Sequence, residues 1–71
     1  MTVQVGVGER VRVLAFERHV TQKELAKTIG VSRMSLTRRL NGSVPFNDFE
    51  LILLGVRLGV PVGAFFGEDA A

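Results

Sequence analysis

The sequence predicts an all-α domain built from five short helices. Apolar residues recur at helical spacing, most of these segments follow a residue that favours a helix N-terminus, and glycine follows most of them. With 71 residues, of which 46% are hydrophobic, the chain can form one small core. We therefore expect an N-terminal arm over residues 1–7, a compact domain over residues 8–67 and a frayed tail over residues 68–71.

The first helix is predicted over about residues 8–18, because three apolar residues recur there on one helix face. These residues are Val7, Val11 and Leu14. The second helix has a sharper beginning, since Thr21 is followed three residues later by Glu24 in the pattern of a capping box. It should end at Gly30, because glycine adopts positive φ without steric strain.

The third helix is predicted to begin after Ser32, a favourable N-cap, and to end at Asn41 and Gly42, which tolerate left-handed backbone. A turn of about three residues that contains Gly30 joins it to the second helix. Two helices joined by so short a turn predict the helix-turn-helix geometry.

Two further helices are predicted in the C-terminal part. One begins at Asn47, again with a glutamate three residues later, and runs to Leu58 before a glycine. The last is short, with Pro61 in its first turn and Phe66 near its end.

The fourth helix carries more apolar surface than one core needs. One stripe is Leu51, Leu54, Gly55 and Leu58, and a second is Phe49, Ile52, Leu53 and Val56, with a similar excess at Val13 and Phe16. Either this helix is buried all round within the domain, or its second stripe contacts another copy of the chain. We favour a homodimer whose interface contains Phe49, Ile52, Leu53, Val56, Phe65 and Phe66.

The charge is concentrated in the middle of the chain. Residues 21–45 hold five basic residues and one acidic residue, whereas residues 46–71 hold one basic and four acidic residues. A local basic block is typical of proteins that bind polyanions, although it can also be no more than a solvated helix face.

The third helix predicts two faces of different chemistry. Leu36 and Leu40 form the inner face, and the opposite face is centred on Met34 and Arg38, with no acidic residue on the helix. Such a helix suits the major groove of DNA. The expected base contacts are Arg33, Met34, Ser35 and Arg38. The expected phosphate contacts are Gln22, Lys23, Lys27, Arg39, Asn41 and Ser43.

Several short segments resemble the Cro/CI-type (XRE, lambda-repressor-like) helix-turn-helix family over roughly residues 7–66. They are Gly8–Arg12 (GERVR), Thr21–Ala26 (TQKELA), Gly30–Ser32 (GVS), Arg39–Gly42 (RLNG) and Leu58–Pro61 (LGVP). The resemblance implies a compact five-helix, lambda-repressor-like domain, usually dimeric on a pseudo-palindromic operator. It also places four residues at the usual DNA-contacting positions: Gln22, Arg33, Met34 and Arg38.

The chain departs from the family pattern at three positions. Arg39 stands where an apolar residue is common, and Leu40 where a polar one is more frequent. This exchange puts the exact facing of the end of the third helix in question. His19 stands where glycine is common, at the end of the first helix, and we interpret it as a tolerated cap rather than a ligand.

Several other classes of function have no support in the sequence. There is no cysteine and only one histidine, so we expect no disulfide, metal site or cofactor. No residue is placed to activate Ser32 or Ser35, so we expect no enzyme. With no membrane span, leader or small-molecule site in view, we expect a protein of the cytoplasm of a bacterial or phage-infected cell.

These observations predict a sequence-specific, double-stranded DNA-binding transcriptional regulator. With little room for a sensor domain, we expect a repressor of the phage Cro or minimal immunity-repressor type that occupies an operator. Two alternatives stay open: a DNA-binding accessory factor of recombination or excision, and an antitoxin-like module that binds a partner protein.

Overall fold

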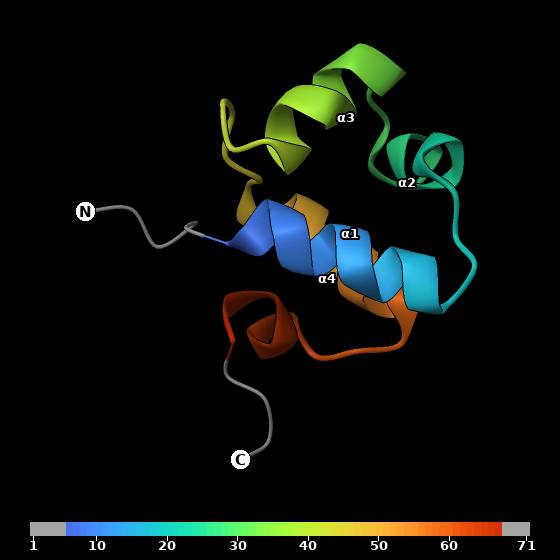
Figure 1. The fold of residues 1–71 in the computed structure, drawn as a ribbon, viewed down its shortest axis with the longest axis vertical. Helices are drawn as coiled ribbons and strands as arrows, with labels where there is room; N and C mark the ends of the chain where they lie inside the picture. Colours follow the sequence, from blue (N-terminus) through green and yellow to red (C-terminus); the bar gives the residue numbers. More distant parts are fainter. Residues whose placement is uncertain (1–5, 68–71) are drawn as a thin grey trace.

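The computed structural model describes residues 6–67 and shows the predicted all-α fold (Figure 1). Within that range there is no strand. The elements are α1 (Val7–Glu17), α2 (Gln22–Ile29), α3 (Arg33–Leu40), α4 (Asp48–Leu58) and the 3-10 helix η1 (Val62–Phe66). The expected arm falls almost entirely outside the described residues, as does the whole of the expected tail.

The fifth helix differs from the expectation of five α-helices. Residues 62–66 form a 3-10 helix, in which Ala64 N–H donates to the carbonyl of Pro61 at 3.0 Å. Gly67, with φ of 80°, ends it after five residues. So short a segment favours the tighter i→i+3 pattern, which is common in pieces of this length.

The core lies where the helices meet. α1 contacts α3, α4 and η1, while α2 contacts α3 and α4. In Figure 1, α1 crosses in front of α4, with α2 and α3 above them and η1 below. The largest fully buried side chains come from all five elements: Val7, Val11, Leu25, Leu36, Leu51, Leu54 and Phe65.

The predicted helix caps are present. Thr21 Oγ1 accepts a hydrogen bond from Glu24 N–H, and a carboxylate oxygen of Glu24 accepts one from Thr21 N–H at 2.8 Å. Asn47 forms the same reciprocal capping box with Glu50 at the start of α4. Ser32 Oγ caps α3. These caps satisfy N–H groups that a helix leaves unpaired and so fix where each helix begins.

Two glycines set the position of α3. Gly30 ends α2 with φ of 76° and allows the tight turn into α3. Gly8 lies in α1, where an added Cβ would stand 2.1 Å from the carbonyl oxygen of Leu40. The end of α3 can therefore approach α1 only because residue 8 has no side chain.

His19 follows α1 with φ of 59°, so a histidine adopts the left-handed conformation that favours glycine. Its N–H donates to the carbonyl of Phe16 at 3.1 Å. This agrees with the interpretation of His19 as a tolerated cap.

Candidate nucleic-acid interface

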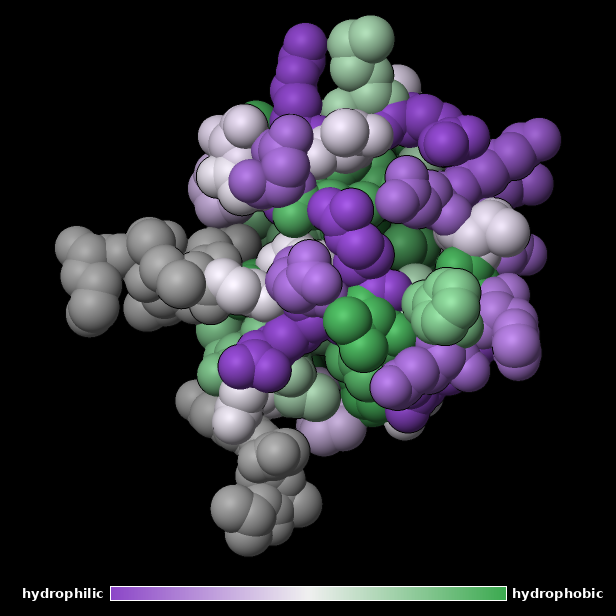
Figure 2. All heavy atoms as spheres, viewed as in Figure 1, coloured by the Kyte–Doolittle hydropathy of each residue, from purple (hydrophilic) through white to green (hydrophobic). Residues whose placement is uncertain are grey.

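α3 presents the two faces that the sequence predicts. Leu36 and Leu40 are buried in the core, whereas Arg33, Met34 and Arg38 are exposed. Thr37 is exposed on the same side, although its hydroxyl donates to the carbonyl of Arg33 at 3.0 Å. The outer side of α3 is thus cationic and polar, with one exposed methionine. Figure 2 shows mostly hydrophilic side chains over α2 and α3.

Two of the expected base contacts lie side by side. Arg38 Nη2 lies 3.7 Å from Met34 Sδ, one helical turn earlier. Arg33 stands at the first residue of α3, next to the turn from α2. The three side chains therefore lie on the exposed edge of α3. A helix of this kind fits the major groove of DNA, where such side chains can reach the edges of bases.

Arg39 and Ser35 lie differently from the other residues of this set. Arg39 donates to both carboxylate oxygens of Glu50 on α4, at 3.1 and 3.3 Å. Its Nη1 also donates to the carbonyl and hydroxyl oxygens of Ser35. Both residues are half-buried. The phosphate contact expected of Arg39 and the base contact expected of Ser35 thus fall on side chains already engaged within the domain.

The remaining expected phosphate contacts lie on α2 and in the turn after α3. Gln22 is the half-buried first residue of α2, and Lys23 and Lys27 are exposed on the same helix. Asn41 and Ser43 are exposed in the turn after α3, where Asn41 Oδ1 accepts a hydrogen bond from Ser43 N–H at 3.1 Å. The structure therefore places them on the two segments that flank α3.

Arg12 is an exposed cation near the expected phosphate contacts that the sequence did not single out. This exposed side chain borders one hollow that contains Gln22 and another that contains Asn41. Its only described ion pair is with exposed Glu9, at 3.8 Å, a contact of small energetic weight. The close approach at Gly8 brings α1 to the end of α3, so that glycine was the signal that could have revealed Arg12.

The second apolar stripe of α4 is exposed in the single chain. Phe49 is 66% and Val56 78% exposed, and Ile52 is exposed while Leu53 is half-buried. The interpretation of α4 as a helix buried all round within the domain is therefore wrong. On α1, Val13 and Phe16 are exposed as well. Figure 2 shows a group of hydrophobic side chains over α1 among hydrophilic ones.

The expectation that Phe65 belongs to a dimer interface is wrong. Its side chain is fully buried and belongs to the core, so it offers no surface to a second copy. Its neighbour Phe66 is half-buried and packs against that core. Residues 62–66 form a 3-10 helix, in which neighbouring side chains point in different directions. Phe65 therefore faces the core, while Phe66 lies nearer the surface.

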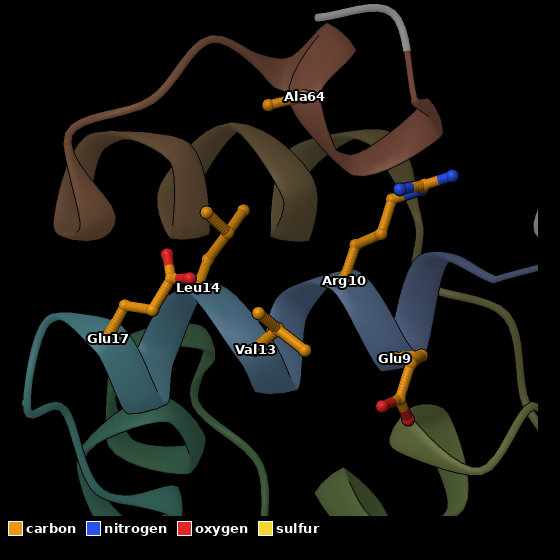
Figure 3. A pocket seen from close by; sticks show the side chains of 6 residues that line it. All are labelled: Glu9, Arg10, Val13, Leu14, Glu17 and Ala64. Carbon is orange, nitrogen blue, oxygen red and sulfur yellow. The ribbon is translucent and has the colours of Figure 1, made fainter.

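A shallow hollow of about 330 Å³ lies between α1 and η1 (Figure 3). Leu14 and Arg10 point from α1 toward η1, and Ala64 of η1 faces them. Glu9, Val13 and Glu17 complete its lining. Figure 1 shows α3 above α1 and η1 below it, so this hollow is not part of the exposed edge of α3.

Two helices joined by a tight glycine turn, with a cationic outer edge on the second helix, define a helix-turn-helix domain. A family model described as helix-turn-helix matches residues 11–65. The chain therefore belongs to the XRE/Cro-CI-type helix-turn-helix family and is a DNA-binding regulator of the XRE type, whose partner is double-stranded DNA. No curated protein and no solved structure matches it. Within residues 6–67, no helix is both long and apolar enough to cross a membrane.

Proposed function

We propose that the protein is a sequence-specific repressor of the phage Cro or minimal immunity-repressor type, which acts by occupying an operator. The observation that carries this proposal is the outer edge of α3, whose exposed residues include two arginines and no acid. In the major groove, Arg33 and Arg38 offer paired donors to guanine, at about 1–3 kcal/mol of discrimination each. Met34 offers an apolar contact to a thymine methyl group.

Contacts to the phosphates fix the register of α3 on the duplex. The first residue of α2, Gln22, can place its amide and the free N–H groups of that helix end on a phosphate. Arg12 adds a charge between Gln22 and the turn after α3. The other proposed contacts are Lys23, Lys27, Asn41 and Ser43. These contacts make binding depend on salt without reading the sequence.

A homodimer through the second stripe of α4 would complete the reading of an operator. A two-fold axis relates two identical surfaces, and it would set two α3 helices about 34 Å apart, one turn of DNA. The exposed stripe of Phe49, Ile52 and Val56 supports this arrangement, and the half-buried Leu53 and Phe66 are the other proposed interface residues. An operator read in this way is an inverted repeat.

Selection of bound sequences from a random duplex pool, at one stated salt concentration, tests the proposal. We expect an enriched inverted repeat whose half-sites are centred about 10 base pairs apart. Enrichment of a single unrepeated site would contradict the dimer but keep sequence recognition. A pool that stays random after several rounds, at low salt as well, would contradict sequence-specific binding.

A further inference from the structure

We propose that Arg39 and Glu50 form an ion pair that positions α3 on the domain, and that Arg39 is a positioning residue rather than a phosphate contact. The inference rests on the proposed function, since its consequence is how Arg33 and Arg38 are presented to bases. It concerns a pair of residues eleven positions apart in sequence, on two different helices.

The two side chains meet through a pair of hydrogen bonds, one to each carboxylate oxygen. Arg39 Nε donates to Glu50 Oε1 at 3.1 Å, and Nη2 donates to Oε2 at 3.3 Å. The Arg39 side chain is 16% exposed and that of Glu50 is 9% exposed. A planar guanidinium that meets a carboxylate through two parallel bonds is fixed in direction as well as distance, and partial burial limits screening by salt.

Glu50 connects α3 to the first turn of α4. The same Oε1 that binds Arg39 also accepts the N–H of Asn47 at 3.1 Å, as half of the α4 capping box. Among residues 6–67, Glu50 is the only buried charged residue. One carboxylate thus fixes the start of α4 and anchors α3.

Arg39 also contacts the preceding turn of α3. Its Nη1 donates to the carbonyl oxygen of Ser35 at 3.1 Å and to the Ser35 hydroxyl. Ser35 lies one turn earlier, between the exposed Met34 and the buried Leu36. The guanidinium therefore connects the middle of α3, and not only its last turn, to α4.

The same contacts argue against a role on the DNA backbone. Lys23 and Lys27 are exposed and free to reach a phosphate, whereas Arg39 would first have to leave Glu50. That exchange would leave a buried carboxylate without its partner, which is costly. Arg39 therefore acts through the placement of Arg33, Met34 and Arg38, the residues on the exposed side of the helix.

Glu50→Gln is the variant that tests this role with the least damage to the fold. Glutamine at this position can still complete the capping box, so α4 keeps its beginning. The variant and the wild type are titrated with the selected operator and with a scrambled duplex, at several salt concentrations. We expect the operator-to-scrambled affinity ratio to fall about tenfold, the size of one lost base contact, with an unchanged salt slope.

Lys23→Ala is the matched control, because it removes an exposed charge from the surface around α3. It should weaken binding to both duplexes alike and reduce the salt slope by about 0.9. The double variant Arg39→Met with Glu50→Gln leaves no unpaired buried charge and should keep the wild-type slope. A slope reduced by about 0.9 in the double variant, with the affinity ratio intact, would identify Arg39 as a phosphate contact and overturn the inference.

A measurement without DNA separates this inference from the proposed function. If the wild type prefers no duplex, the proposed function fails, yet the ion pair can still be tested by hydrogen exchange of the arginine Nε–H groups. We expect Arg39 Nε–H to exchange more slowly than Arg38 Nε–H, and α3 amide resonances to shift in Glu50→Gln but not in Glu17→Gln, which removes an exposed carboxylate from the other end of α1. Equal exchange of the two arginines, or an unmoved α3, would contradict the anchor.

Discussion

The position of Arg12, between Gln22 and the turn after α3, leads to a prediction about DNA affinity. Arg12→Ala should weaken binding to every duplex and lower the salt slope by about 0.9, because one phosphate contact is lost. Arg10→Ala is the control, since Arg10 lies on the same helix but points toward η1 (Figure 3). The affinity of both variants for one duplex is measured at several salt concentrations. Equal salt slopes for Arg12→Ala and the wild type would show that Arg12 does not contact a phosphate.

The close contact at Gly8 leads to a second prediction, which concerns the stability of the fold. Gly8→Ala would add a Cβ 2.1 Å from the backbone oxygen of Leu40, which cannot rotate away. Alanine favours a helix more than glycine does, yet we expect a net loss of roughly 1–3 kcal/mol from the forced separation of α1 and α3. Urea unfolding measures this loss, with the exposed neighbour Glu9→Ala expected to stay within about 0.5 kcal/mol. A Gly8→Ala variant as stable as the wild type would mean that α1 and α3 are farther apart.

The capping box of α2 gives that helix a dependence on pH. The hydrogen bonds that Glu24 accepts from the Thr21 backbone N–H and hydroxyl, together with nearby Arg57, hold the pKa of its carboxyl below the usual value. A carboxyl whose pKa is lower in the folded state stabilises that state above its unfolded pKa. This contribution is lost as the pH falls through the folded pKa.

We therefore expect the wild type to be more stable than Glu24→Gln at neutral pH, and the difference to shrink as the pH falls below about 4.3. Thermal unfolding of both proteins across this range measures the difference. Glu9→Gln serves as the control for removal of an exposed carboxylate. A difference that stays constant with pH would show that the Glu24 carboxylate does not stabilise the cap.

The beginnings and ends of the helices could be predicted because they depend on neighbours in sequence. Thr21 and Glu24 lie three residues apart, and a glycine such as Gly30 adopts its conformation locally. The same local logic identified Leu36 and Leu40 as the inner face of α3. Much of the candidate interface follows from that division of faces.

The engagement of Arg39 could not be predicted in this way. Its partner Glu50 lies on another helix, beyond a loop whose path the sequence does not specify. The family resemblance places Arg39, unlike Arg38, where an apolar residue is common, but it does not identify the partner of the charge, which only packing against α4 reveals. Arg12 was missed for the same reason, because its neighbours are α2 and the turn after α3.

Within residues 6–67, most of the second stripe of α4 is exposed, which leads to a prediction about assembly. In sedimentation at micromolar concentration, the wild type should be a dimer and Phe49→Asp a monomer, because a charge would replace a 66% exposed aromatic ring in the proposed interface. Phe16→Asp is the matched control, since Phe16 is exposed on α1 outside that interface. A monomeric wild type, or equal dissociation of both variants, would contradict a dimer through α4.

If the exposed edge of α3 reads bases, replacement of Arg38 must change which base pairs the protein prefers. The wild type and Arg38→Ala are titrated, at one salt concentration, with the selected operator and with duplexes substituted at each position in turn. We predict that Arg38→Ala loses its preference at one position of each half-site, by about 1–3 kcal/mol, and keeps its preference elsewhere. If both proteins show the same base preferences at every position, Arg38 does not read the operator, and α3 does not present its exposed edge to bases as proposed.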